Sequence, residues 1–477
     1  MQNSHHKLIK EHWSIFIIAT LAPLLLYVVW PILPTHDDWV GTTTPDFSPF
    51  FSKEHFFFYG YHWRPFDTWI GYLAGRNPQL LFPSMHHTLV VIGHLLCTLA
   101  IFRLLGVLHF NRVAQNVTTL FFFMLPATMA TVTAIDSQNQ VYALLTGLIS
   151  FFVYIRKGKY KYVVWPIMIF LATLFKENGL MWALICPILA YCFDFIDRKT
   201  MRKDLIVGIG IMMTYALVIA IQPKDIIIHP EYEPGLLKIM KNVVKFLFSS
   251  FVTVDYIYLL HQPNRNILLA LGSLLFTLPF FYIVYLRHWR LFLHKQMTAT
   301  ALCLLIAVGP HLLTTFSMMH TYAGLAFVAV MTAYSIDAYK GNTRPVILCF
   351  SLFLLATLAI NTHLIDASID SGRVGKRMAH EAIQKTGKPV DNVYVIIIED
   401  DYPKLSSFCV IPNEAFGWGL AAQYETNYQW PKTVKDTTIT NTENAIVQAE
   451  NIAKEYISKK MYDAVWVVSH DQVEIIK

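Results

Sequence analysis

The sequence has few charged residues. They make up 15% of its 477 residues, against about 25% in an average soluble domain, whereas 55% of the residues are apolar. This balance excludes an ordinary soluble enzyme. The net charge of +6 does not indicate nucleic acid as a partner, because the basic residues lie in short clusters between long apolar runs. That distribution is typical of membrane proteins that cross the bilayer several times.

The sequence also lacks a cysteine framework and a phosphate-binding glycine loop. Five of its six cysteines fall within apolar runs, and one stands alone near the carboxyl end (Cys97, Cys186, Cys192, Cys303 and Cys349; Cys409). There is no CxxC or Cys/His spacing typical of zinc, and no internal repeat. Disulfide-stapled, zinc-binding and repeat architectures are therefore not expected.

Charge is spread unevenly along the chain. Residues 1–363 contain 26 Lys and Arg and 16 Asp and Glu. Residues 364–477, a much shorter stretch, contain 12 Lys and Arg and 16 Asp and Glu. This contrast predicts a polytopic α-helical membrane domain over 1–363 and a small soluble α/β domain over 364–477. In the soluble domain, Asn392 to Ile398 and Asp463 to Ser469 resemble buried strands, and Glu443 to Lys460 an amphipathic helix. We interpret this soluble domain as a cap or a specificity element over a site in the membrane domain.

Apolar stretches long enough to cross about 30 Å of hydrocarbon predict about eleven transmembrane helices. Their expected starts are Trp13, His86, Val117, Val141, Tyr162, Gly179, Leu205, Ile267, Thr298, Tyr322 and Pro345. The first run follows a short basic segment but has no small-x-small cleavage site, so we expect an uncleaved anchor. Two long loops remain, at 34–84 and 222–266.

The basic residues in the short loops set the expected orientation. With a cytoplasmic amino terminus, seventeen basic residues fall on the cytoplasmic side, and the opposite short turns hold only Lys176. The two long loops and the carboxyl-terminal domain then lie outside. We therefore expect a multi-pass protein of the cell (inner) membrane with an extracytoplasmic, periplasmic carboxyl-terminal domain.

An acidic pair follows the first apolar run, in the segment Pro34-Thr-His-Asp37-Asp38-Trp39. Carboxylates at a membrane boundary are costly to desolvate and favour a cation or a hydroxyl proton as partner. Either carboxylate could act as general base. The alternative is that the pair caps a short helix.

Arginine and histidine side chains follow in the same outer loop and in the second span. Arg64, in His62-Trp63-Arg64-Pro65, can bind a phosphate or a carboxylate with two hydrogen bonds, or serve as a membrane anchor. His87 and His94 lie seven residues apart, near one face of the second span. They either mark a polar pathway or satisfy neighbouring helices.

Two further polar points lie at outer turns: Lys176-Glu177-Asn178, and His320-Thr321-Tyr322. An ion pair at a membrane boundary is expensive, so Lys176 and Glu177 are functional candidates, with a structural clasp as the alternative. A carboxylate, several cations and an aromatic rim suit a substrate that is part lipid and part anionic headgroup. These features do not distinguish a lipid-linked sugar phosphate from an anionic solute of a transporter.

These motifs resemble the GT-C class of integral-membrane glycosyltransferases that use polyprenyl-phosphate sugars. Within that class they are most similar to O-mannosyltransferases that carry tetratricopeptide repeats and to their bacterial relatives. The likeness rests on Asp37-Asp38, on Trp63-Arg64-Pro65, on Pro83 with His87 and His94, and on Lys176-Glu177-Asn178-Gly179-Leu180. It covers roughly residues 10–190, with weaker agreement in topology to about 363.

The sequence departs from the family pattern at three points. Val90 stands where the family usually has an asparagine, and His320-Thr321-Tyr322 stands in place of a late motif containing arginine. The carboxyl-terminal domain has no tetratricopeptide repeats. The donor-phosphate contact at the late position and the acceptor are therefore left open.

The resemblance implies a role for each matching residue. Asp37 would be the catalytic base or would orient the acceptor, with Asp38 as its neighbour or replacement. A donor and substrate site would contain Arg64, His87, Lys176, Glu177, His320 and Tyr322, with Glu177 orienting Lys176. No metal is expected to be obligatory, although Asp37 and Asp38 could hold Mg²⁺ or Mn²⁺.

The resemblance thus implies a hexosyl- or pentosyltransferase that moves a sugar from a polyprenyl-phosphate donor to a glycan, lipid or protein acceptor, with inversion. Expected partners are this donor, the acceptor and membrane lipids. A ligase or polymerase of lipid-linked glycans is a second hypothesis, and the single arginine in the loop 222–266, Arg265, counts against it. A secondary transporter is a third, although related halves and broken midplane helices are not evident.

Overall fold

The computed structural model describes most of the chain in fourteen stretches. These are residues 11–35, 64–67, 70, 84–156, 158, 160–220, 235–251, 264–313, 317–339, 343–398, 415–426, 429–440, 442–469 and 472–476. All structural statements below concern these residues.

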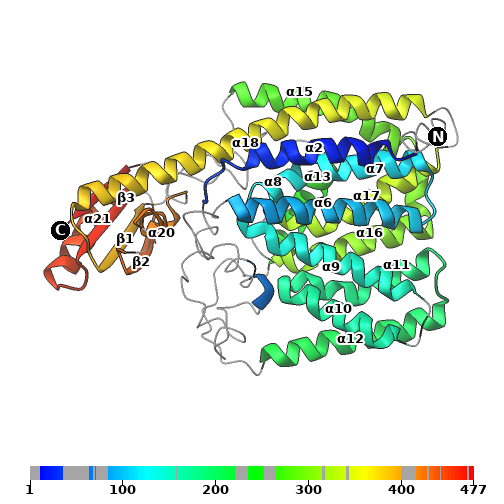
Figure 1. Ribbon diagram of the computed structural model, residues 1–477, viewed down its shortest axis with the longest axis horizontal. Helices are drawn as coiled ribbons and strands as arrows, with labels where there is room; N and C mark the ends of the chain where they lie inside the picture. Colours follow the sequence, from blue (N-terminus) through cyan, green and yellow to red (C-terminus); the bar gives the residue numbers. More distant parts are fainter. Residues whose placement is uncertain are drawn as a thin grey trace.

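Helices that run side by side form the larger part of the molecule (Figure 1). They are α2 (Trp13–Val29), α6 (Ser84–Val107), α7 (Arg112–Met124), α8 (Pro126–Val132), α9 (Gln138–Ile155), α10 (Lys161–Phe175), α11 (Trp182–Cys192), α12 (Arg198–Ala220), α13 (Leu236–Phe251), α15 (Asn264–Phe281), α16 (Lys295–Val308), α17 (Tyr322–Asp337) and α18 (Arg344–Thr386). Short turns of 3₁₀ or π helix connect several of them: η3 (Ile135–Ser137), η4 (Glu177–Met181), η6 (Tyr282–Leu286), η7 (Trp289–Leu293), η8 (Gly309–Leu313) and η9 (Met318–Thr321).

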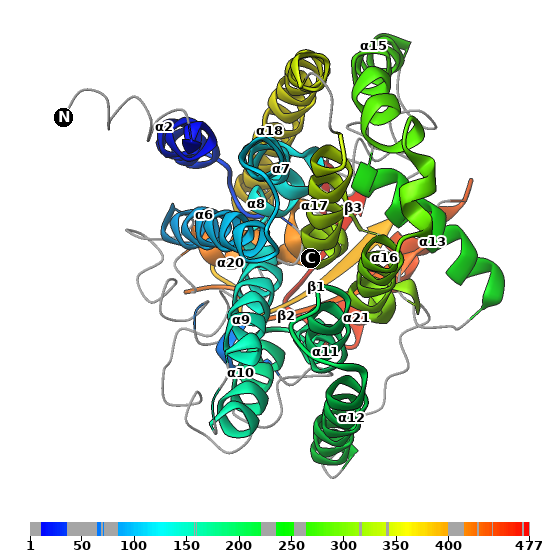
Figure 2. The same ribbon diagram turned by 90° about the vertical axis from the view of Figure 1, so that its right-hand side faces the viewer.

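The helix α17 lies in the middle of this bundle when it is viewed end-on (Figure 2). Every residue of α17 except Tyr334 and Asp337 is buried, which suits a sequence that is apolar on all sides. The beginning of α2 and the carboxyl-terminal domain lie at opposite ends of the bundle (Figure 1).

Five of the described helices are long and apolar enough to cross a membrane: Met85–Val107, Arg198–Ala220, Lys295–Leu313, Met318–Asp337 and Arg344–Thr386. A sixth is possible if α7 and α8, bent by 49° at Leu125-Pro126, form one span; proline at the first position of α8 interrupts the hydrogen-bond ladder there. These helices identify a multi-pass membrane protein. A helix lies at each of the eleven expected positions, but the number of spans stays a prediction.

One helix lies in a region that the sequence predicts as a loop. α13 falls within 222–266, where three lysines among apolar residues (Lys238, Lys241 and Lys245) make the segment too charged for a span. It packs against the bundle, and the Asn242 side-chain amide donates a hydrogen bond to the carbonyl oxygen of Leu312, 2.8 Å away.

The helix α18 connects the bundle to the carboxyl-terminal domain. It runs without a break for 43 residues and ends at Gly387, whose φ of 72° gives the left-handed cap that glycine adopts easily. The expected boundary between residues 363 and 364 lies inside this helix. The two parts are therefore joined by a continuous helix.

The carboxyl-terminal domain is a four-stranded sheet in the order β2-β1-β3-β4. Its elements are β1 (Asn392–Ile398), η10 (Gly417–Gly419), α20 (Leu420–Glu425), β2 (Thr433–Ile439), α21 (Ala445–Ser458), β3 (Ala464–Ser469) and β4 (Gln472–Ile476). β1 is parallel to β2 and β3, and β4 is antiparallel to β3. The two predicted strands and the predicted amphipathic helix are confirmed as β1, β3 and α21.

Both faces of this sheet are covered. On β1, Val393, Val395 and Ile397 join an apolar cluster with the last turns of α18, and Ile396 and Ile398 join a cluster with α21. The alternation follows from the two-residue period of a strand. Ile135 of η3, in the membrane domain, belongs to the first cluster and is 3% exposed, so this domain packs directly on η3.

Candidate functional site

A tight turn between α10 and η4 presents Lys176 and Glu177. α10 ends at Phe175, and Lys176 is extended, with φ −158° and ψ 146°. Gly179 allows η4 to return against α10, because a Cβ at this position would lie 2.4 Å from the backbone carbon of Ala172. The turn is held at the end of the bundle near the carboxyl-terminal domain (Figure 1).

A short helical turn at residues 65–67 brings Arg64 to the same place. Pro65 opens the turn, where its missing N–H is not needed. The Phe66 ring packs edge-on against Phe175 at 5.3 Å between centroids, and Phe175 stacks on Tyr142 of α9 at 5.6 Å. These aromatic contacts fix the segment against α9 and α10.

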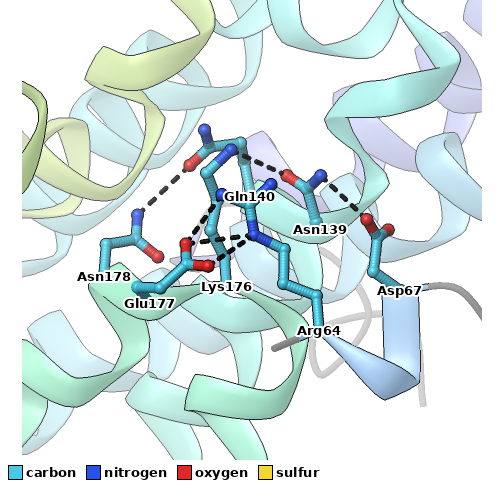
Figure 3. Close-up of polar contacts among 7 residues, drawn as sticks. All are labelled: Arg64, Asp67, Asn139, Gln140, Lys176, Glu177 and Asn178. Atoms are coloured by element: carbon cyan, nitrogen blue, oxygen red, sulfur yellow. Dashed lines mark hydrogen bonds and ion pairs between the residues drawn. The ribbon is translucent and has the colours of Figure 1, made fainter. Parts of the chain in front are cut away.

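Arg64 and Glu177 form a forked ion pair (Figure 3). Nε of Arg64 lies 2.8 and 3.0 Å from the two carboxylate oxygens of Glu177, and Nη2 lies 2.7 Å from Oε2. The side chains are 18% and 29% exposed. Burial opposes the charge on Arg64, but the attraction and hydrogen bonds of Glu177, together with the charges of Asp67 and Asp136, outweigh burial and raise the pKa of the guanidinium. The guanidinium therefore stays ionised at neutral pH.

Lys176 is buried, at 3% exposed, and faces α9. Its ammonium donates to Oδ1 of Asn139 at 3.2 Å, and Nδ2 of Asn139 donates to Oδ2 of Asp67 at 3.1 Å (Figure 3). Burial and the nearby Arg64 lower the pKa of Lys176, against the attraction of Asp136, Glu177 and Asp67. The amide of Asn139 thus links a cation to a carboxylate.

The carboxyl of Asp67 has its pKa raised. Burial is the main cause and repulsion by Asp136 adds to it, while Arg64, the hydrogen bond from Asn139 and Lys176 act in the opposite direction. Oδ1 of Asp67 is buried and has no hydrogen-bond partner among the described residues. This carboxyl holds a proton at a higher pH than an ordinary aspartate does.

Two histidines lie beside this group of charges. The rings of His311 and His320 stack in parallel, 4.1 Å apart between centroids and 4° from coplanar. His320 is close enough to Lys176 and Arg64 for their charges to act on it. Its Nδ1 is buried without a hydrogen-bond partner in the part of the chain that the structure describes.

The structure brings together Arg64, Lys176, Glu177 and His320 from the expected set. His87 instead hydrogen-bonds through Nε2 to the carbonyl oxygen of Ile32, 3.0 Å away. The Tyr322 hydroxyl lies 2.8 Å from Nδ1 of His94 and is fully buried, so it packs within the bundle. Asp37 and Asp38 lie outside the described residues, so their roles stay predictions.

Several members of the site were not predicted from the sequence: Asp67, Asp136, Gln138, Asn139, Gln140, Asn178 and His311. Asp67 could have been predicted as a neighbour of Arg64, because a residue three positions later falls on the same side of a helical turn. The run Asp136 to Gln140 also gave an indication, because five polar residues in succession end η3 and begin the otherwise apolar helix α9. His311 gave no indication beyond its residue type.

The described residues contain no group of three or more His, Cys, Asp or Glu side chains able to hold a metal ion. The predicted Mg²⁺ or Mn²⁺ site at Asp37 and Asp38 falls on residues whose placement is not described. Metal dependence therefore stays a prediction.

The arrangement suits an anion with several oxygen acceptors. Lys176 has three ammonium protons, of which Asn139 takes one. A second cation, Arg64, and the histidine pair lie beside it, all in surroundings of low dielectric where each charge acts strongly. A phosphate that reached Lys176 from the lipid side would meet these groups together.

No family model and no curated protein matches this chain. Among solved structures it is similar to the oligosaccharyltransferase of Archaeoglobus fulgidus tethered with an acceptor peptide, at 15% identity and TM-score 0.47 over 97% of this chain and 70% of the other. It is also similar to oligosaccharyltransferase AglB of that organism in complex with an inhibitory peptide and a dolichol-phosphate, at 14% identity and TM-score 0.48 over 96% and 70%.

A third similar structure is ArnT of Cupriavidus metallidurans bound to undecaprenyl phosphate, at 12% identity and TM-score 0.46 over 97% of each chain. At these identities and TM-scores, none of the three assigns an activity to this chain.

The raised pKa of Asp67 predicts how stability depends on pH. Above about pH 4 the unfolded carboxyl ionises, but the folded one still holds its proton, so wild-type stability falls as pH rises toward the folded pKa. Asp67→Asn keeps an acceptor for Asn139 and removes this titration. We therefore expect its apparent Tm to rise relative to wild type between pH 5 and 8, measured on the purified protein.

Asp370→Asn is the matched control, because Asp370 is an exposed member of a surface ion pair. Its apparent Tm should follow that of wild type across the same range. Parallel curves for wild type and Asp67→Asn would contradict the raised pKa.

Proposed function

We propose that this protein is a membrane glycosyltransferase that takes its sugar from a polyprenyl-phosphate donor. The observation that carries the proposal is the group formed by the buried Lys176 and the partly buried pair of Arg64 and Glu177, at one end of an apolar helix bundle. A lipid phosphate can keep its tail beside such helices and place its headgroup at their end. The acceptor is a glycan, a lipid or a protein.

In this proposal the cations stabilise the leaving phosphate. The glycosidic bond between the anomeric carbon and the phosphate oxygen breaks, and negative charge collects on the lipid phosphate. Lys176 donates hydrogen bonds to that phosphate, with Arg64 and His320 beside it. Because Glu177 and Asn139 hold the two cations in place, little reorganisation is needed as the charge develops.

The acceptor hydroxyl attacks the anomeric carbon directly, with inversion, and a carboxylate takes its proton. The motif after the first helix assigns this role to Asp37, with Asp38 beside it. Asp67 is the positioning residue, since its hydrogen bond from Asn139 fixes the amide that holds Lys176.

The orientation proposed for the chain places this reaction outside the cytoplasm. The basic loops put the amino terminus in the cytoplasm, and the site lies at the opposite end of the bundle, beside the carboxyl-terminal domain (Figure 1). The cell (inner) membrane is then the expected location, and the carboxyl-terminal domain covers the acceptor side.

Lys176 tests the phosphate assignment. Lys176→Met keeps the length of the side chain and removes the charge that stabilises the leaving phosphate, so we expect kcat/KM to fall by about 100-fold or more. The measurement is transfer of labelled sugar from decaprenyl-phosphate sugars to a panel of acceptors by purified protein in detergent. Lys176→Arg should recover part of the rate.

Lys295→Met is the control, because Lys295 forms a partly exposed pair with Asp194 at a loop outside the site. It should transfer at the wild-type rate. Undiminished transfer by Lys176→Met would contradict the phosphate assignment. A transporter would give a different pair of results. Wild type would transfer no sugar in detergent, and it would carry solute across the membrane of proteoliposomes, where a solute gradient can form.

The base assignment is tested by Asp37→Asn combined with Asp38→Asn. Loss of a general base lowers rates by about 10² to 10⁴-fold, so we expect kcat to fall by that order while the Kd of decaprenyl phosphate changes little. Asp67→Asn should keep kcat within about tenfold, because asparagine still accepts from Asn139. If the double variant keeps the wild-type kcat, or if Asp67→Asn lowers kcat by more than tenfold, the assignment of Asp37 and Asp38 as the base is wrong.

A further inference from the structure

Three amide side chains begin α9 and a fourth faces them from η4. Gln138, Asn139 and Gln140 are the first residues of α9, and Asn178 is the second residue of η4. Their exposed fractions are 5%, 0%, 0% and 3%. Four primary amides are thus buried next to Lys176, where an apolar bundle would otherwise place apolar side chains.

Two of these amides share one hydrogen bond. Nδ2 of Asn178 donates to Oε1 of Gln140 at 3.1 Å (Figure 3). Gln138 donates only through Nε2, to the backbone oxygen of Asp67 at 3.4 Å. Asn139 differs, since its oxygen and nitrogen are both used, by Lys176 and Asp67.

Three amide atoms therefore have no hydrogen-bond partner among the described residues. They are Nε2 of Gln140, Oδ1 of Asn178 and Oε1 of Gln138, and all three are buried. Rotating an amide by 180° exchanges its donor and acceptor without supplying a partner. Folded proteins rarely leave such groups unsatisfied, so a ligand with matching groups is indicated.

The chemistry of these atoms separates a sugar from a phosphate. An ionised phosphate only accepts hydrogen bonds, so an amide oxygen cannot bind it. A hydroxyl both donates and accepts, and can satisfy the nitrogen of Gln140 and the oxygens of Gln138 and Asn178 alike. A sugar carboxylate, like a phosphate, only accepts hydrogen bonds and cannot satisfy the oxygens of Gln138 and Asn178.

We propose that Gln138, Gln140 and Asn178 bind the hydroxyls of a neutral sugar on the lipid-linked donor. This inference rests on the proposed function, in which Lys176 binds the donor phosphate. Asn139 lies between the two Gln residues in the chain and holds Lys176, so the sugar site adjoins the phosphate site. Amides select the sugar, and cations select the phosphate.

The test compares the Kd of bare decaprenyl phosphate with that of decaprenyl phosphate carrying glucose, mannose, galactose or glucuronic acid. The full-length protein in lipid nanodiscs is used. We expect at least one neutral sugar to tighten binding by about tenfold or more, and glucuronic acid to give no such gain. Gln140→Met, which has a similar volume but no amide, should reduce the gain to about threefold or less.

Bare decaprenyl phosphate serves as the folding check within each variant. Its Kd should stay near the wild-type value in Gln140→Met and in Gln138→Met, because the hydrogen bond of the Lys176 ammonium among the described residues goes to Asn139 and to neither of these glutamines. Gln115→Met is the matched control: Gln115 is a buried glutamine near the start of α7 whose amide is satisfied by Arg112 and by the backbone of Phe110. It should keep the full sugar gain.

Two results overturn the inference in different ways. If wild type binds bare decaprenyl phosphate but no neutral sugar adds affinity, or if Gln140→Met and Gln138→Met both keep the full gain, the sugar site is wrong and the proposed function stands. If wild type binds no polyprenyl phosphate at all, the proposed function fails and the inference fails with it.

Discussion

Arg64 and Glu177 are 113 residues apart in the chain, and their side chains meet through three hydrogen bonds. Arginine keeps its charge under all ordinary conditions, so a guanidinium at this depth requires a fixed carboxylate. The pair therefore joins the segment at 64–67 to η4. With Glu177 turned toward Arg64, its neighbour Lys176 is left to face Asn139 and α9.

The carboxyl-terminal domain also helps to position the site. Ile135 of η3 is buried in an apolar cluster with β1, β3 and the end of α18. The next residue is Asp136, and the amides of α9 follow from Gln138. A Cβ on Gly375 of α18 would lie 2.3 Å from the backbone oxygen of Ala415, so this domain packs closely on the helix that carries it. The domain thus supports the turn that begins α9.

Much of this fold could be predicted from the sequence, because hydropathy and strand alternation are local signals. α13 was missed since its lysines interrupt an apolar run, and packing on the bundle decides its fold. The pairing of Arg64 with Glu177, by contrast, depends on long-range packing that no local pattern encodes. The roles of Gln138 and Gln140 are not evident from the sequence, because a neutral amide shows no charge pattern and its role depends on partners that come from other elements.

In the function proposed for this protein, Lys176, held beside the Arg64–Glu177 pair, binds a lipid phosphate. A cryo-EM structure of the protein with decaprenyl phosphate tests it most directly. We expect phosphate density within about 3 Å of the Lys176 ammonium, with the hydrogen bonds between Arg64 and Glu177 retained. Phosphate density at any other place on the bundle, with Lys176 bonded only to Asn139, would contradict it.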